Sequence, residues 1–415
     1  MKCRICSNPQ GVSTSFGDMP IANGFLAEKD FQKEYFFKME TLFCDVCKTY
    51  QLIEQPDPEM MFHENYAFFS STSKNMAVHF KEMADGYMQD FIPNKGNAFV
   101  VELGSNDGIM LKYFAQEGIK HLGIEPSSNV AEVARQHGVN TISEFFGAET
   151  AQAVEAEYGK ADIISASNVM CHIPDLNSVG QGVDALLKET GIFVFEDPYL
   201  GSMISKTSYD QIYDEHVYIF SVLSVQNIFA PHGLELFHVE PQVTHGGSMR
   251  YYLCRKGTRA VRDSVKTQVQ KEKDLGLDKV ETYEKFTQSC EKSKKDFVTL
   301  LTKIKAEGKR VVGYAATSKS TTVLNYCNVG PDLIEYICDT TPLKQGKYSP
   351  GMHIPIKPYE DFKNDNPDYA VLFAWNHAEE IFAKEKGFLA QGGKWILFIP
   401  KVSVFETEDK LKNAI

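Results

Sequence analysis

The residues best suited to chemistry lie near the middle of the chain, where Tyr213, Asp214, Glu215 and His216 follow one another directly. This run brings together a phenol, two carboxylates and an imidazole. An imidazole with an unperturbed pKa near ~6.5 can accept a proton at neutral pH, and a phenol can donate a hydrogen bond to a developing oxyanion. We therefore expect the run to remove a proton from a carbon atom and to hold the negative charge that results. Taken without their context, Glu215 and His216 would more often form the solvated start of a helix.

Four cysteines near the N-terminus have the spacing of a metal site. Cys3 and Cys6 form one CxxC pair, and Cys44 and Cys47 form another. Four thiolates make a closed tetrahedral zinc site with no position left for a substrate, so we predict a structural Zn²⁺. The alternative is four ordinary buried cysteines. A redox dithiol is disfavoured because neither pair begins a helix after a strand.

An acidic loop follows a hydrophobic run at residues 98–103. It reads Gly104-Ser105-Asn106-Asp107-Gly108 and differs from GxGxxG because Asn106 replaces the second glycine. Glu102 and Asp107 would repel a pyrophosphate but attract the ammonium and sulfonium groups of S-adenosylmethionine. We predict that Glu102, Gly104, Asn106, Asp107 and Gly108 bind this cofactor. A nicotinamide dehydrogenase and a purely structural glycine turn are the alternatives.

Two more residues, each at the end of a hydrophobic run, are predicted to bind the same cofactor. Glu125 ends the next hydrophobic run about 20 residues after Gly104, the place from which an acidic residue accepts hydrogen bonds from ribose hydroxyls. Asn168 ends a third run, and ligands collect where parallel strands end. The aromatic and serine-rich residues 66–73 are interpreted as a lid over the cofactor, with an ordinary linker as the alternative.

The elements that position these residues follow from the pattern of apolar runs. The runs at 98–103, 121–124, 161–166 and 192–196 alternate with amphipathic stretches, which predicts a parallel sheet covered by helices. A charged helical stretch over 259–309 precedes a second α/β unit, and we expect the two units to share one plan. With about 100–200 residues per domain, 415 residues accommodate a zinc-binding part at 1–75, a cofactor domain at 76–257, and a helical linker with a C-terminal domain at 258–415.

Composition restricts the partners. The net charge of −12 argues against nucleic acid and anionic lipid. No apolar run reaches the ~18 residues of a membrane span, and the start of the chain has no secretory h-region. Five further cysteines are scattered singly, a pattern typical of a reducing compartment. We expect a soluble cytoplasmic protein.

In combination, these features resemble the sugar C-methyltransferases of deoxysugar biosynthesis. The resemblance covers nearly the whole chain and is carried by residues 102–108, 168–173, 196–200, 213–216 and 348–356, together with the cysteine pairs. It implies an α/β fold in which a Rossmann-like methyltransferase domain lies between a small zinc-binding domain and a C-terminal Rossmann-like domain. Relatives often have a more glycine-rich turn at residues 313–320, so no contacts are carried over there.

The family also implies the reaction. Its substrate is a nucleotide-linked 4-keto-6-deoxy sugar (dTDP or GDP), methylated on a ring carbon, C3 in preference to C5. The C4 ketone acidifies the neighbouring C–H, so a base and an oxyanion donor are needed. The family places catalytic roles on His172, Tyr213, Glu215 and His216.

Within that set we expect His216 to be the base, with Tyr213 as the alternative. Tyr213 and His172 would donate to the enolate oxygen, and Glu215 would orient His216 or bind the sugar. An N- or O-methyltransferase on the same sugars is the nearest rival. An RNA methyltransferase is a weaker one because the chain is acidic.

Overall fold

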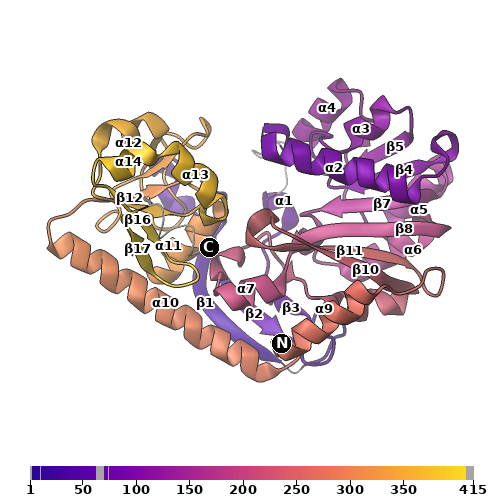
Figure 1. Ribbon diagram of the computed structural model, residues 1–415, viewed down its shortest axis with the longest axis horizontal. Helices are drawn as coiled ribbons and strands as arrows, with labels where there is room; N and C mark the ends of the chain where they lie inside the picture. Colours follow the sequence, from indigo (N-terminus) through magenta and orange to yellow (C-terminus); the bar gives the residue numbers. More distant parts are fainter. Residues whose placement is uncertain (1, 10, 62–69, 73, 408–415) are drawn as a thin grey trace.

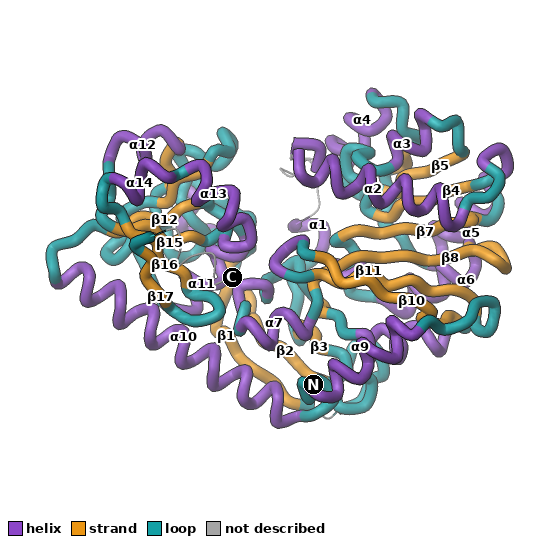
Figure 2. The backbone as a smooth tube through the Cα atoms, in the orientation of Figure 1, coloured by secondary structure: helices purple, strands orange, loops and turns teal. Residues whose placement is uncertain are grey.

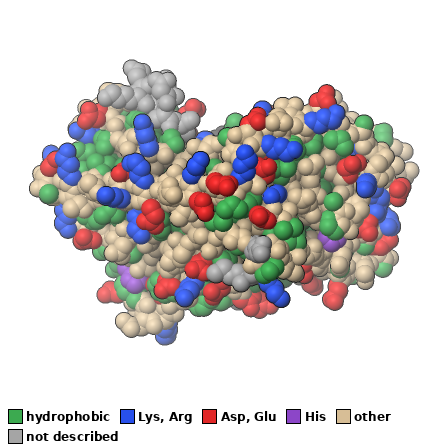
Figure 3. Space-filling model, turned by 90° about the horizontal axis from the view of Figure 1, so that it is seen from below, with side chains coloured by type: hydrophobic (Ala, Val, Ile, Leu, Met, Phe, Trp, Pro, Cys, Tyr) green, Lys and Arg blue, Asp and Glu red, His purple; other side chains and the backbone are tan. Residues whose placement is uncertain are grey.

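The computed structural model describes residues 2–9, 11–61, 70–72 and 74–407, which form three sheets joined by helices (Figure 1). Among these residues no helix combines the length and the apolar character that crossing a bilayer requires. On the face shown in Figure 3, acidic and basic side chains are interspersed, and no basic stripe gathers there.

The N-terminal sheet is completed by a strand from the middle of the chain. Its strands are β1 (Val12–Pro20), β2 (Phe36–Phe43), β3 (Tyr50–Leu52) and β9 (Tyr218–Ile219), in the order β1-β2-β3-β9. Strand β9 begins two residues after His216 and pairs antiparallel with β3. The sheet beside the cysteine pairs therefore also fixes one end of the Tyr213–His216 run.

The central sheet has seven strands. They are β4 (Phe99–Leu103), β5 (Lys120–Ile124), β6 (Thr141–Ile142), β7 (Ala161–Ser167), β8 (Leu187–Pro198), β10 (Leu234–Gln242) and β11 (Ser248–Arg255). The order is β10-β11-β8-β7-β4-β5-β6, parallel from β8 to β6 and antiparallel at β10 and β11. All five residues of β4 are buried, as expected of a parallel strand covered on both faces. The chain order reverses at β4, so its carboxyl end opens a crevice with that of β7.

Helices flank this sheet (Figure 2). They are α2 (Lys74–Phe91), α3 (Leu111–Gln116), α4 (Ser128–Gln136), α5 (Ala148–Tyr158), α6 (Leu176–Leu186), α7 (Leu200–Lys206) and α8 (Val222–Phe229), and a short α1 (Pro58–Met61) precedes them. Helices α9 (Asp263–Asp274) and α10 (Val280–Ala306) then lead to the last sheet. Tyr283, Phe286, Cys290, Phe297 and Leu301 form the buried face of α10, at a spacing that suits one side of a helix.

The C-terminal sheet repeats the plan of the central one. Its strands are β12 (Val311–Tyr314), β13 (Ile337–Asp339), β14 (Ile356–Pro358), β15 (Tyr369–Leu372), β16 (Lys394–Leu397) and β17 (Ser403–Phe405), in the order β14-β13-β12-β15-β16-β17. Only β17 is antiparallel among these strands. Helices α11 (Ser318–Cys327), α12 (Tyr359–Asp365), α13 (Ala378–Lys384) and α14 (Lys386–Ala390) accompany it. Phe16 and Phe43 of the N-terminal sheet share one hydrophobic core with Phe373 and Trp395, so these two parts pack as a continuous body.

Candidate active site

Three positions at the carboxyl ends of β4 and β7 require unusual backbone angles, Gly104 and Asn106 after β4 and Asn168 after β7. Gly104 has φ +59°, and a Cβ there would lie 2.4 Å from a methyl group of Val169. Asn106 has φ +50° and Asn168 has φ +57°. Asparagine tolerates this left-handed region better than most residues, which explains why a loop lacking the second glycine still turns.

Glu125 holds this loop in place. Glu125 is the first residue after β5. Its Oε2 accepts a hydrogen bond from the Asn106 amide (3.0 Å), and its Oε1 accepts one from the Ser127 amide (2.8 Å). Each carboxylate oxygen can accept a second hydrogen bond, so ribose hydroxyls can still bind. Sequence reasoning missed the contribution of Glu125 to shaping the loop.

The acidic side chains of the loop are buried together. Glu102, Asp107 and Glu125 are all nearly inaccessible to solvent. Burial, and then the neighbouring carboxylates, raise the pKa of Glu102 well above its ordinary value, and burial raises the pKa of Glu125. Among the described residues, Glu102 Oε2, Asp107 Oδ1 and Asn168 Oδ1 are buried acceptors without a hydrogen-bond partner. Unsatisfied acceptors in a negative crevice fit the cationic methionyl end of S-adenosylmethionine.

Two serines from the predicted lid contact the same loop. The Ser70 amide donates to Asn106 Oδ1 and the Ser71 amide donates to Asp107 Oδ2, each at 3.0 Å. The hydroxyl of Ser71 also donates to Asp107 Oδ2. Tyr66, Phe68, Phe69 and Ser73 lie outside the described residues.

His216 is held in one tautomer. Its Nδ1 lies 2.6 Å from the carbonyl oxygen of Gln211, which can only accept, so Nδ1 carries the hydrogen. Nε2 then presents a lone pair and accepts the hydroxyl of Tyr213 at 2.7 Å. Burial, with His172 and Lys319 nearby, lowers the pKa of His216 well below its ordinary value. The ring is therefore neutral at pH 7, and its Nε2 is able to accept a proton.

His172 lies beside this ring. It belongs to a short 3₁₀ helix, Met170–His172, that follows Asn168, and its ring centroid is 5.4 Å from that of His216. Burial lowers the pKa of His172 to about 4. The structure thus brings together His172, Tyr213 and His216, three of the four residues to which the resemblance gives catalytic roles.

The two acidic residues of the run are tied to the N-terminal part. Asp214 Oδ1 accepts from the Ala22 amide (3.1 Å), and Glu215 Oε1 accepts from the side-chain amide of Asn23 (2.6 Å). Burial raises the pKa of Glu215, and the cation of Lys344 opposes that effect. Asn23 and Lys344 carried no sequence signal, since they lie far from the run along the chain.

A group of cations was also missed. The ammonium groups of Lys206 and Lys319 lie 5.6 Å and 5.2 Å from the centroid of the Trp375 ring. The indole N–H of Trp375 donates to Asp210 Oδ2 (2.6 Å). Lys319 is almost fully buried, and burial lowers its pKa. Two ammonium groups beside one carboxylate leave net positive charge next to the run, which favours an anionic ligand.

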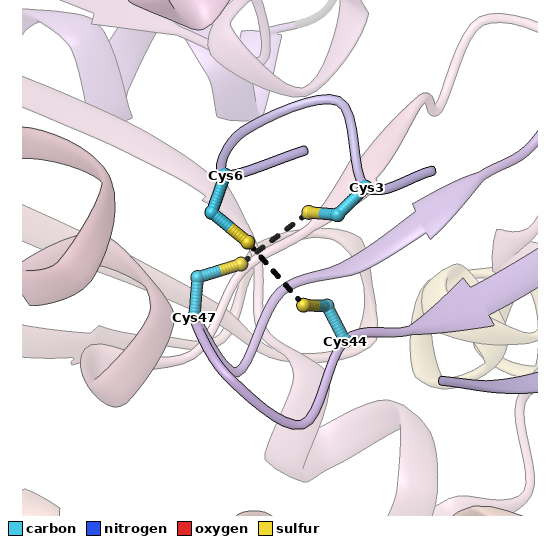
Figure 4. Close-up of side chains that lie close together, drawn as sticks. All are labelled: Cys3, Cys6, Cys44 and Cys47. Carbon is cyan, nitrogen blue, oxygen red and sulfur yellow. Dashed lines mark hydrogen bonds between the residues drawn. The ribbon is translucent and has the colours of Figure 1, made fainter. Parts of the chain in front are cut away.

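The four N-terminal cysteines converge in a separate cluster (Figure 4). Cys3 Sγ lies 3.4 Å from Cys47 Sγ, and Cys6 Sγ lies 3.6 Å from Cys44 Sγ. A tetrahedral ion with Zn–S bonds of about 2.3 Å places its sulfurs about 3.8 Å apart. The side-chain amide of Gln51 donates to Cys3 Sγ at 3.0 Å, as suits a thiolate. The donor set and its geometry fit zinc.

Three family models match consecutive parts of the chain. They are described as "Putative zinc binding domain" (residues 3–62), "Methyltransferase domain" (77–239) and "C-methyltransferase C-terminal domain" (243–400). C-methyltransferase NovU of Streptomyces niveus is 34% identical over 413 residues, which cover 99% of this chain and 98% of that protein. The chain belongs to the C-methyltransferase family. It is accordingly an S-adenosylmethionine-dependent methyltransferase with a Rossmann-like central domain.

Further similarities cover smaller shares of the chain. The ubiquinone biosynthesis O-methyltransferase of Actinobacillus pleuropneumoniae serotype 5b (strain L20) is 31% identical over 120 residues, 26% of this chain and 50% of that protein. Among solved structures, the PH0226 protein of Pyrococcus horikoshii OT3 has a TM-score of 0.37 at 14% identity, over 46% of this chain and 95% of that one. Magnesium protoporphyrin IX methyltransferase of Synechocystis PCC 6803, with bound SAH, has a TM-score of 0.34 at 14% identity, over 43% and 83%.

Proposed function

We propose that this C-methyltransferase adds a methyl group to a ring carbon of a nucleotide-linked 4-keto-6-deoxy sugar, at C3 in preference to C5. The observation that carries the proposal is the neutral His216, whose Nε2 lone pair faces the Tyr213 hydroxyl. Methylation of nitrogen or oxygen needs no enolate. A buried base beside two hydrogen-bond donors is the arrangement that proton removal next to a ketone does need.

The proton is transferred to His216 in this proposal. Nε2 takes the hydrogen from the carbon next to the C4 ketone, and the Gln211 carbonyl, bound to Nδ1, stabilises the imidazolium. If Tyr213 is the base instead, its hydroxyl proton passes to the same Nε2. In the same proposal His172, whose ring lies beside that of His216, donates to the enolate oxygen, and Glu215, which is bound by Asn23, binds a sugar hydroxyl or amine.

S-adenosylmethionine supplies the methyl group when bound. Glu102, Asp107 and Asn168 present the buried acceptors for its ammonium group, and Glu125 has lone pairs for its ribose hydroxyls. Gly104, Asn106 and Gly108 shape the loop so that these groups face one crevice. The amides of Ser70 and Ser71 hold the side chains of Asn106 and Asp107 at one side of it.

The nucleotide part is supported by charge. A nucleotide-linked sugar carries a diphosphate, whether its base is thymine or guanine. The cations of Lys206 and Lys319 lie near the ring of Trp375, and Lys319 also acts on Asp210 and on His216 of the run, so that in this proposal they bind that diphosphate. We propose in addition that Cys3, Cys6, Cys44 and Cys47 hold a structural Zn²⁺.

The test is the identity of the product. Protein, S-adenosylmethionine and a panel of dTDP- and GDP-linked 4-keto-6-deoxy sugars are incubated, and the product is read by NMR. A new methyl group on C3 supports the proposal. A methyl group on nitrogen or oxygen, or turnover only with RNA, would contradict it.

A further inference from the structure

A second cluster of metal-ligand residues lies inside the candidate active site. Ligand atoms of Cys171, His172 and His216 are all within 4.8 Å of one another. Cys171 and His216 are buried, and His172 is half-buried. The three side chains come from two segments, residues 171–172 after β7 and residue 216 before β9, and are distinct from the N-terminal cysteine cluster.

The donor atoms suit a thiophilic cation. Thiolate and imidazole ligands favour Zn²⁺ and similar ions over Mg²⁺ or Ca²⁺. A tetrahedral zinc with bonds of about 2.3 Å to sulfur and about 2.0–2.1 Å to nitrogen needs donors about 3.5 Å apart. The three donors lie within 4.8 Å of one another, which is close to that spacing. Three protein ligands would leave the fourth position of a tetrahedral ion for water.

The surroundings of the cluster resemble the outer shell of a metal site. The Gln211 carbonyl accepts the hydrogen of His216 Nδ1, as the outer-shell partner of a ligating histidine does, so Nε2 is the ring nitrogen that carries a lone pair. The Asp197 carboxylate is fully buried beside the Cys171 thiol. A Cys171 thiolate together with an ionised Asp197 carboxylate would balance the charge of a bound dication.

We propose that Cys171, His172 and His216 form an inhibitory site for Zn²⁺ or a similarly thiophilic divalent ion. On binding, a metal–sulfur bond forms as the Cys171 thiol releases its proton to solvent, and no electron is transferred. His216 Nε2 then coordinates the metal and no longer accepts the hydrogen bond of the Tyr213 hydroxyl. Because its lone pair is bound to the ion, His216 can no longer act as the proposed base. The inhibitory consequence rests on the proposed function, whereas binding itself does not.

Binding is tested first on protein that holds one equivalent of zinc. Equilibrium dialysis against Zn²⁺ should show a second equivalent, and added Co²⁺ should give a sulfur-to-cobalt charge-transfer band. Cys171→Ser should weaken this second event by at least about 10–100-fold, the loss found even for outer-shell changes. Cys254→Ser is the matched control, because Cys254 is also a buried free cysteine but lies in β11, outside the cluster. Mg²⁺ should not compete.

The outcomes separate binding from function. One equivalent only in the wild type, or an unchanged second equivalent in Cys171→Ser, overturns the site. If Cys171→Ser does not fold, the number of zinc equivalents bound by Cys171→Ala and the charge-transfer band of the wild type decide whether Cys171 is a ligand. Loss of turnover with Zn²⁺, reversed by chelator and absent in Cys171→Ser, supports the inhibitory role. A second ion bound without loss of turnover overturns that role. An enzyme inactive on every sugar tested leaves the dialysis result valid.

Discussion

Replacement of His216 by alanine tests the proposed base most directly. The change removes the Nε2 lone pair and leaves the Tyr213 hydroxyl and the Gln211 carbonyl without their 2.7 Å and 2.6 Å partners. General base catalysis contributes ~10²–10⁴ in rate, which corresponds to about 2.7–5.5 kcal/mol of barrier. We expect turnover to fall by that factor. The two orphaned groups cost about 1–3 kcal/mol each in folding stability, so folding must be measured beside the rate.

The assay measures two quantities on one sample, proton exchange and product formation. Exchange of the C3 proton with deuterium oxide reports proton removal without methyl transfer, and product formation reports the complete reaction. His216→Ala should lose both, yet bind S-adenosylmethionine as the wild type does, because Glu125 and not His216 holds the cofactor loop. His216→Gln is the control of similar size. Calorimetry provides the binding reading.

Tyr213→Phe separates the two bases. If Tyr213 only donates a hydrogen bond, its loss should reduce turnover less than that of His216. If it is the base, the two losses should be comparable. Near-normal turnover in both variants would refute the reasoning and show that the run is structural. His172, the neighbouring neutral imidazole, would then be the group to replace.

Three further expectations concern metal, cofactor and pH. Purified protein should contain about one zinc per chain, which Cys44→Ser should lose together with stability; metal-free protein of undiminished stability would refute the site. Glu125→Ala should weaken S-adenosylmethionine binding by about 1–3 kcal/mol in calorimetry, and unaltered affinity would count against its role. Burial lowers the pKa of His172 and of His245 to about 4, so between pH ~6.5 and about 4 the unfolded chain binds protons that the folded chain does not. The free energy of unfolding should therefore fall as pH falls through that window, by about 2–3 kcal/mol per histidine, and His245→Gln should make the denaturant-measured slope shallower; an unchanged slope would contradict this.

Much of the central fold was readable because its strands are continuous apolar runs. The strand at 98–103 is followed directly in sequence by the acidic loop, so the crevice at the end of β4 could be predicted from local pattern alone. The grouping of His172 with His216 required the resemblance, since only the pairing of β9 with β3 and the parallel sheet bring these segments together. Asn23 reaches Glu215 across 192 positions, and Lys319 lies on α11, beyond the linker helices. Such contacts depend on how whole sheets pack and leave no periodic or spacing signal.

The pairing of β3 with β9 connects the cysteine cluster to the segment that carries His216. Gln51 donates to Cys3 Sγ and stands opposite Tyr218 in the ladder, only two residues from His216. A metal that orders the cysteines would thus restrict the backbone of β3 and β9, and with it the position of His216, the proposed base. If zinc at the cysteines and a sugar nucleotide at the Tyr213–His216 run favour each other's binding in this way, reciprocity requires a bound sugar nucleotide to raise the equilibrium affinity for zinc, as measured by competition with a chelator.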